Sequence, residues 1–207
     1  MTATAHDHKL DSLLANAALI FAEDGYHRTS MRDLARASNV SLSGLYYYVE
    51  SKEELLYLIQ SRNFDAVIAR LREELVGVSD PVERLSRFVE NHLDYFVSHI
   101  SEMKVLSHEA KSLSGEYLAR VTHTKREYTR ILMDILSDVE DTHGPAHTNR
   151  RVAAYALFGM MNWIYTWYDP LGDLGVELLS QNICSLFLGG YVGLPVTEQS
   201  LPRATAG

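Results

Sequence analysis

The sequence predicts an all-α protein, with an N-terminal domain of three helices joined to a larger helical domain. Three observations lead to this prediction. Apolar residues recur at helical spacing along nearly all of the 207 residues. Hairpin turn signals are nearly absent, and the one Asp-Gly pair, Asp24-Gly25, follows a helical pattern. The five prolines fall where apolar-periodic runs begin or end, which are positions that helices tolerate.

The composition narrows the class of protein. The chain carries 19 Lys and Arg against 27 Asp and Glu, a net charge of −8. Taken alone, that charge argues against nucleic-acid and anionic-membrane partners. The single cysteine, Cys184, excludes a disulfide framework and a cysteine-rich zinc site, and its apolar helix predicts a small core residue. The first residues lack an apolar signal segment, so we expect a cytoplasmic protein.

Three N-terminal helices are predicted in order. The first spans 9–24 and ends at Gly25, which is well placed as a helix-terminating glycine. The second begins at Thr29 or Ser30 as N-cap, and residues 38–40 form a tight turn. Ser41 is the N-cap of a third, short helix through 47 or 48. The residues expected to face the core of the first two helices are Leu10, Leu13, Leu14, Ala17, Ala18, Phe21, Met31, Leu34 and Ala35.

The remaining pattern is also helical. A capping box, Ser51-Lys52-Glu53-Glu54, opens a long helix that Gly77 ends. Further helices are predicted over 80–99, 102–113, 114–141, 148–168 and 172–189. We expect a helix-turn-helix domain over 1–52, a second domain over 53–194 that binds a ligand and forms a dimer, and a disordered tail over 195–207.

The two short helices form a helix-turn-helix arrangement, because a tight turn joins them after a longer helix. The free N–H groups at the start of the third helix suit a phosphate-lined groove. Gly44 costs about 1 kcal/mol inside a helix, but a missing side chain lets the helix approach a base edge. Three consecutive tyrosines, 46–48, cannot all be buried on one short helix. The pattern therefore favours DNA binding.

The same residues resemble the TetR family of transcriptional repressors. The resemblance covers about residues 9–56 and rests on Gly25-Tyr26, on 29–35 (TSMRDLA), on Val40-Ser41, on 44–48 (GLYYY) and on 51–55 (SKEEL). Tyr48 and Val49 depart from the His-Phe of many members, and both are mild changes. The resemblance implies a homodimer with one DNA reader per protomer. It also implies release from a palindromic operator when a small molecule binds the second domain.

Residue roles at the DNA follow from side-chain chemistry at the matching positions. Phosphate contacts are predicted for Thr29, Tyr46, Tyr48 and Lys52, and groove contacts for Ser41, Ser43, Gly44 and Tyr47. Arg32 approaches from the preceding helix and can donate to a guanine edge. Ser30 is also predicted to be a DNA-binding residue. The alternatives are that the rings of Tyr46 and Tyr48 pack under the next helix, and that Arg32 pairs with a carboxylate.

The acidity is uneven along the chain. Residues 1–52 hold five Lys and Arg against six acids, while residues 53–207 hold 14 against 21. The DNA reader is thus nearly neutral, and the net charge of the whole chain reflects the second domain. Because few cations can release counterions from the duplex, we expect DNA binding with a shallow salt dependence.

The second domain contains an uncharged run over 152–168 that is too short and too aromatic for a membrane span, so no membrane partner is expected. A helix that is apolar on all sides is buried on all sides, so one side can line a ligand cavity and the other a dimer interface. The predicted ligand-binding residues are Met103, Tyr128, Met160, Met161, Asn162, Trp163, Trp167 and Tyr168. The predicted dimer-interface residues are Phe158, Tyr165, Leu179, Ile183 and Phe187. Asn162 is either a satisfied core residue or a contact to ligand or partner.

The segment from Asn162-Trp163 to Trp167-Tyr168-Asp169-Pro170 is similar to C-terminal regions of TetR-type regulators that sense acyl-CoA. That resemblance implies a small apolar or amphipathic effector, such as an acyl-CoA. The alternative is a neutral lipophilic or aromatic compound, such as a drug or steroid. Cations for the CoA end would come from basic residues that can equally form solvated helix faces: Arg120, Lys125, Arg126, Arg130, Arg150 and Arg151.

Two other classes of protein, a helical enzyme and a helical adaptor, fit the sequence less well. A helical enzyme would need a paired acid–base or nucleophile constellation, and the sequence contains none that is correctly spaced. The histidine pairs His143/His147 and His92/His99 lack metal-ligand spacing, so no metal or cofactor is expected. A helical adaptor would leave the complete N-terminal reader unexplained. A DNA-binding regulator is the prediction.

Overall fold

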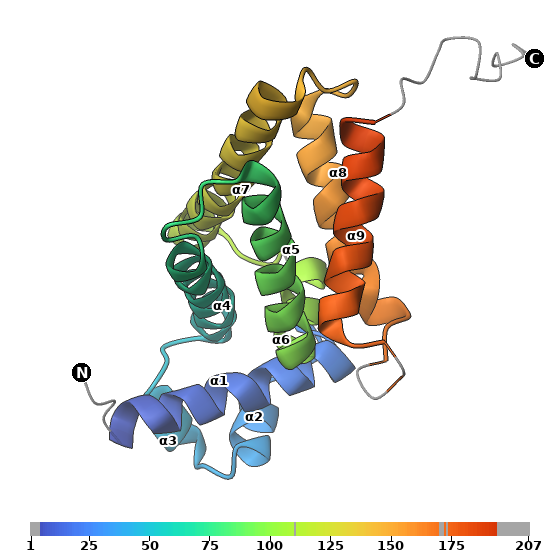
Figure 1. Ribbon diagram of the computed structural model, residues 1–207. Helices are drawn as coiled ribbons and strands as arrows, with labels where there is room; N and C mark the ends of the chain where they lie inside the picture. The colour runs from blue at the N-terminus through green and yellow to red at the C-terminus, as the bar shows by residue number, and fades with distance from the viewer. Residues whose placement is uncertain (1–4, 110, 170–171, 173, 194–207) are drawn as a thin grey trace, which may run out of the picture. The chain divides into compact units, whose positions relative to one another are not determined.

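The computed structural model describes residues 5–109, 111–169, 172 and 174–193. Every regular element in these residues is helical, which confirms the predicted all-α class (Figure 1). The predicted tail, 195–207, lies outside the described residues. The elements are α1 (Ala5–Asp24), α2 (Met31–Ala37), α3 (Leu42–Tyr46), α4 (Lys52–Glu74), α5 (Pro81–Ser98), α6 (Ile100–His108), α7 (Gly115–His143), α8 (Arg150–Asn162), the 3₁₀ turn η1 (Trp163–Thr166) and α9 (Val176–Tyr191).

The chain forms two compact units. Unit 1 comprises Met1–Arg72 and Tyr95–Tyr128, and unit 2 comprises Glu73–Asp94 and Thr129–Gly207. In unit 1, α2 and α3 lie together on one side of α1, and α6 packs against α1 (Figure 1). The three N-terminal helices therefore share their packing with later segments, and the compact unit extends past residue 52.

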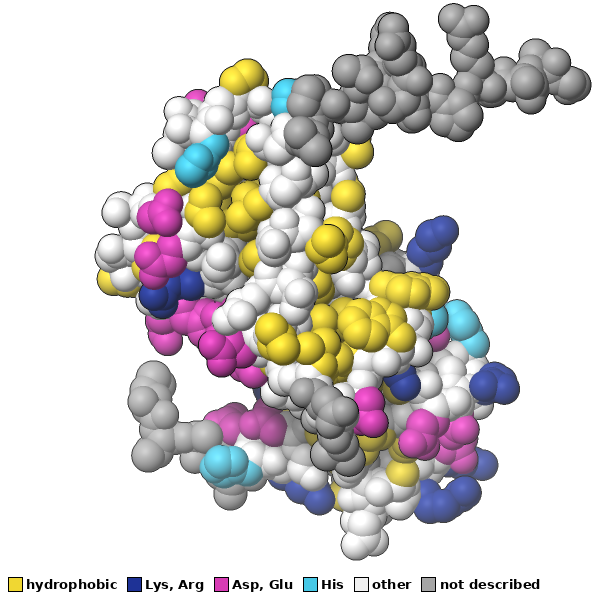
Figure 2. Space-filling model, turned by 45° about the vertical axis from the view of Figure 1, so that its right-hand side comes forward, with side chains coloured by type: hydrophobic (Ala, Val, Ile, Leu, Met, Phe, Trp, Pro, Cys, Tyr) yellow, Lys and Arg dark blue, Asp and Glu magenta, His cyan; other side chains and the backbone are white. Residues whose placement is uncertain are grey.

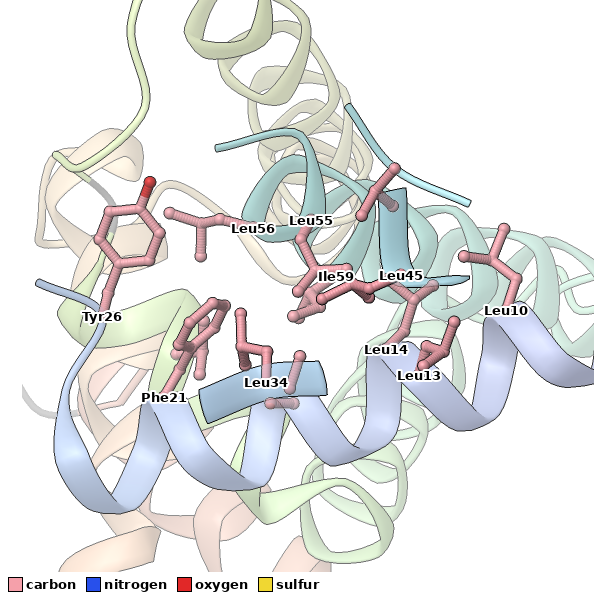
Figure 3. Packing of buried hydrophobic residues seen from close by; sticks show 14 of the residues in the cluster. Leu10, Leu13, Leu14, Phe21, Tyr26, Leu34, Leu45, Leu55, Leu56 and Ile59 are labelled. Carbon is pink, nitrogen blue, oxygen red and sulfur yellow. The ribbon is translucent and has the colours of Figure 1, made fainter. Parts of the chain in front are cut away.

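The three N-terminal helices share a core with α4. Leucine side chains of α1, α2, α3 and α4 point toward one another there (Figure 3). Leu34 of α2 and Leu45 of α3 are each 1% exposed. Burying one leucine contributes about 1.5–3 kcal/mol, so the two short helices are held by tertiary packing more than by helix propensity. The other labelled members are Leu10, Leu13, Leu14, Phe21, Tyr26, Leu55, Leu56 and Ile59.

Several helix boundaries differ from the predicted ones; α6 ends at His108 and not at 113, and α9 begins at Val176 and not at 172. Helix α1 begins at Ala5, which adds a turn that contains His6. The helix predicted over 148–168 ends at Asn162 and continues only as the short turn η1, where the Thr166 hydroxyl donates to the Trp163 carbonyl (2.7 Å). Aromatic and β-branched residues dominate 163–168, and their low helix propensity explains the early end.

In unit 2, α8 and α9 run side by side (Figure 1). Asn149 caps α8, its side-chain oxygen accepting from the backbone N–H of Arg151 (3.0 Å). Glu140 near the end of α7 accepts from Arg150 and from the Tyr191 hydroxyl, and the Arg150 bond lowers the pKa of Glu140. These bonds fasten the start of α8 and the end of α9 to α7. No helix of the described residues is long and apolar enough to cross a membrane.

Candidate nucleic-acid interface

Ser30 begins α2 through a capping box with Asp33. The Ser30 hydroxyl accepts from the Asp33 N–H (3.3 Å), and the Asp33 carboxylate accepts from the Ser30 N–H (3.0 Å). The Ser30 hydroxyl also donates to that carboxylate (2.5 Å), and this bond, together with the one from the Ser30 N–H, lowers the pKa of Asp33. The hydroxyl of Ser30, predicted to belong to the DNA-binding set, is thus engaged in starting the helix.

The short helix α3 depends on a similar cap. The Ser41 hydroxyl accepts from the Gly44 N–H (2.9 Å) and lies 3.1 Å from the Ser43 hydroxyl. A Cβ added at Gly44 would come within 3.1 Å of the Ser41 oxygen, which is a tight contact. The absence of a side chain at Gly44 therefore leaves room for the Ser41 hydroxyl that caps the helix.

The three tyrosines differ in exposure. Tyr46 is 49% exposed and Tyr47 is 74% exposed, whereas Tyr48 is half-buried. The Tyr48 ring packs against Tyr47 (5.1 Å between centroids) and against His6 of α1 (4.8 Å). The Tyr48 ring thus packs against α1, a contact that differs from the predicted alternative of packing under the next helix, while Tyr46 and Tyr47 are exposed. Val49, the other departure from the family pattern, is buried.

Two predicted phosphate contacts have structural roles in the folded chain. Thr29 is only 4% exposed, and its hydroxyl donates to the Gly25 carbonyl (2.9 Å). The Lys52 ammonium donates to the carbonyls of Tyr26 and Thr29, each at 2.8 Å, and lies 4.3 Å from the centre of the Tyr26 ring. The Thr29 prediction is corrected because its side chain is buried. Lys52 uses two of its three donors to hold the α1–α2 loop.

Arg32 is exposed, and the ion pair with Asp33 is made by Arg36 instead (3.6 Å). Besides Arg36, the outer surface of α2, α3 and the two caps of α3 exposes a second guanidinium, two serine hydroxyls and two phenols. We call this surface the reading face, and its residues are Arg32, Ser41, Ser43, Tyr46 and Tyr47. Guanidinium and hydroxyl groups can donate to base edges, and phenols can bind phosphate.

The predicted ligand-binding residues fall in both units. Met103 and Tyr128 are buried in unit 1, and Met161 is fully buried in unit 2. The Asn162 side-chain oxygen lies 3.1 Å from Nε2 of His92, so Asn162 is a satisfied residue, one of the two alternatives. Burial lowers the pKa of His92 to about 4, and His92 is therefore neutral at physiological pH.

The two tryptophans after α8 are exposed, whereas the sequence predicted that they line a ligand site. Trp163 is 61% exposed and Trp167 is 57% exposed, so neither lines an enclosed apolar site in the single chain. Met160 is half-buried. The Tyr168 hydroxyl donates to the Leu174 carbonyl (2.9 Å), which fixes the turn before α9. The early end of α8 at Asn162 explains why these side chains leave the helix register that the sequence suggested.

The predicted dimer residues of α9 face inward. Leu179, Ile183 and Phe187 are each less than 9% exposed within one chain and cannot form an outer surface. Phe158 is half-buried and packs on Phe88, with 6.0 Å between ring centroids, and Tyr165 is half-buried. A different apolar set lies outward on α8, η1 and α9, and Figure 2 shows hydrophobic side chains on the exposed surface. We call this set the α8–α9 face, and its residues are Val152, Tyr155, Trp163, Leu178 and Leu186.

The basic residues considered for a CoA group are mostly engaged. Arg120 pairs with Glu116, and Arg150 pairs with Glu140. Lys125 of unit 1 is half-buried 5.6 Å from the Phe64 ring centre, and burial lowers the pKa of its ammonium. Arg126 and Arg130 are exposed. The solvated-face alternative therefore describes most of them.

Two models of known protein families match the chain. A family model described as "Bacterial regulatory proteins, tetR family" matches residues 13–59. A second, described as "Tetracyclin repressor-like, C-terminal domain", matches residues 78–191. The first match spans the helix-turn-helix, and the second spans more than half of the chain.

Individual relatives cover nearly the whole chain. The transcriptional repressor KstR2 of Mycolicibacterium smegmatis is 27% identical and aligns over 87% of this chain and 89% of its own. The transcriptional activator FasR of the same species is 29% identical, over 93% and 87%. The crystal structure of AibR in complex with isovaleryl coenzyme A and operator DNA is 27% identical, covers 86% of this chain and 97% of its own, and has a TM-score of 0.76.

Proposed function

Because this chain belongs to the TetR family of bacterial regulatory proteins, we propose that it is a ligand-responsive transcriptional repressor. In this proposal a homodimer binds a palindromic operator through α2 and α3. Residues 53–194 bind an effector and form the dimer, and effector binding releases the DNA. The observation that carries the proposal is the reading face, which is exposed on a helix-turn-helix that matches the family.

The reading face supports sequence-selective binding. Arg32 is a donor for guanine, and Ser41 and Ser43 stand at the start of α3, where backbone N–H groups favour phosphate. Tyr46 and Tyr47 are exposed on the same short element. The Arg36 guanidinium is partly offset by Asp33, and Lys52 is engaged within the fold. Few free cations remain, which supports a salt slope shallower than that of a basic DNA-binding domain.

The α8–α9 face supports the homodimer. It exposes five large apolar side chains, each at least half exposed. Contiguous apolar surface on a protein in water marks an interaction site, and a second copy of the same face is the commonest self-complementary partner. We therefore assign the dimer interface to this outward set, in place of the inward residues of α9.

We propose that the effector is an acyl-CoA. AibR, a relative of similar architecture, is described in complex with isovaleryl coenzyme A, and KstR2 is described as a ketosteroid regulator. Within unit 1, Met103 and Tyr128 supply buried apolar side chains suited to an acyl chain or a fused ring system. The alternative is a neutral lipophile, which would need none of the few available cations.

The test begins with selection of duplexes from a random pool by the purified protein. We expect enrichment of a palindrome, and analytical ultracentrifugation should give a dimer on it. Failure to enrich any sequence would contradict the DNA-binding proposal. The same dimer on its selected duplex is then titrated with isovaleryl-CoA, free CoA and a steroid, with fluorescence anisotropy as readout. Release by the acyl-CoA alone supports the first effector class, and release by the steroid alone supports the second.

A further inference from the structure

The N-terminal turn of α1 carries a side chain that the sequence pattern did not connect with DNA. Helix α1 begins at Ala5, and its first turn lies beside α3 in unit 1 (Figure 1). The His6 ring lies 4.8 Å from the Tyr48 ring and 5.9 Å from the Tyr47 ring, measured between centroids. Tyr47 and Tyr48 in turn pack edge-to-face at 5.1 Å. Three rings, from α1 and from the turn that follows α3, thus form one cluster: His6, Tyr47 and Tyr48.

This aromatic cluster borders the reading face. Tyr47 is the most exposed of the three tyrosines, and the His6 side chain is 48% exposed. An aromatic pair of this kind contributes about 0.5–1.5 kcal/mol beyond the area that it buries, enough to favour one orientation of a phenol ring. Solvent, and therefore a duplex lying against Tyr47, can reach the imidazole.

A positive charge on His6 would also affect DNA binding. Histidine is the side chain whose charge ordinarily changes between about pH 5 and pH 8. The titratable groups that face the His6 ring are Asp7 on its own helix, with 4.0 Å between Nδ1 and Oδ1, and the phenols of Tyr47 and Tyr48. One added cation is a large change for a reader that carries five Lys and Arg against six acids over residues 1–52.

We propose that His6 is part of the DNA interface. Its ring positions the two phenols at the end of α3, and its protonated form supplies a cation to a backbone phosphate. This inference rests on the proposed DNA-binding function. It predicts that DNA binding strengthens as pH falls toward 5.5, although the chain as a whole is acidic.

The experiment measures the salt slope of binding to the duplex selected by the wild-type dimer, at pH 5.5 and pH 8. One additional phosphate contact steepens the slope by about 0.9 and tightens binding about fivefold to tenfold at 0.1 M salt. His6→Gln removes the charge, and we expect it to abolish both changes. His8→Ala is the matched control, because His8 is exposed and lies two residues away on the same helix; it should behave as wild type.

Three results separate the inference from the proposed function. A pH-independent slope in the wild type would overturn the inference. A pH effect that persists in His6→Gln would also overturn it, since another group would then be responsible. If the wild type selects no duplex, the proposed function itself fails. A circular-dichroism melt of each variant verifies folding. His6→Phe keeps an aromatic ring without the charge, so at pH 8 it should weaken binding less than His6→Gln, which removes both.

Discussion

Replacing Lys52 with methionine distinguishes a structural role from a DNA contact. The ammonium donates two hydrogen bonds of 2.8 Å to the carbonyls of Tyr26 and Thr29, residues that are 7% and 4% exposed. Methionine retains most of the aliphatic stem and its packing but has no donor. The two carbonyls of the α1–α2 loop would then lose a charged partner at a site with little access to water.

The expected loss of stability follows from these bonds. A hydrogen bond to a charged group contributes about 1.5–3 kcal/mol net, and the contact with the Tyr26 ring adds about 0.5–1 kcal/mol. Lys52 is half-buried, and the contributions of neighbouring contacts do not add fully, so we expect a free-energy loss of about 2–3 kcal/mol. For a chain of this size that loss lowers the melting temperature by about 5–10 °C.

The assay combines thermal unfolding with DNA binding at several salt concentrations. Arg36→Met is the matched control, because Arg36 is exposed and makes only one 3.6 Å pair with Asp33, so its stability should change by less than about 0.5 kcal/mol. Lys52→Met should leave the salt slope unchanged. An unchanged melting temperature with a slope reduced by about 0.9 would refute the structural assignment and restore Lys52 as a phosphate contact.

Three further changes probe the core, the interface and a buried histidine. Leu45→Ala should destabilise the protein by about 2–5 kcal/mol in urea unfolding, because Leu45 is 1% exposed in the α3 core; a loss below 1 kcal/mol would contradict that packing. Leu186→Glu on the α8–α9 face should yield monomers in analytical ultracentrifugation, while Val76→Glu, equally exposed elsewhere, should remain dimeric; dimers from both would reject the face. Burial lowers the pKa of His92 to about 4, below the ordinary 6.5, so its contribution to stability is complete above pH 6.5 and is lost as pH falls toward 4, about 3 kcal/mol in total. His92→Gln should flatten that part of the pH–stability curve, and an identical curve would exclude His92 as the cause.

Local signals in the sequence predicted the N-terminal helices well. The caps at Ser30 and Ser41 and the apolar spacing of Leu34 and Leu45 depend on residues only a few positions apart, so the sequence alone indicates them. The partners of Lys52 could not be predicted in this way. Its acceptors lie 23 and 26 residues away, and only the packing of α4 against the α1–α2 loop brings them together.

The orientation of the apolar helices was the other part that the sequence left undetermined. Residues 152–168 carry no charge, so their pattern does not distinguish an inward from an outward face. Trp163 and Trp167 were predicted to line a ligand site, yet both are exposed once α8 ends at Asn162. Leu178 and Leu186 belong to the same apolar helix, but the interface residues predicted there are Leu179, Ile183 and Phe187. The polar neighbours Gln181, Asn182 and Ser185 are the signal that could have identified the outer side of α9.

The most direct test of the central claim, that the reading face selects the operator, is the sequence preference of Tyr47→Ala. The wild-type and variant dimers each select duplexes from the same random pool, and ultracentrifugation verifies that both are dimers. The proposed function predicts a palindrome for the wild type and a changed preference at matching positions of both half-sites for the variant. Identical selected sequences would show that Tyr47 does not read DNA, and enrichment of no sequence by the wild type would contradict the DNA-binding function itself.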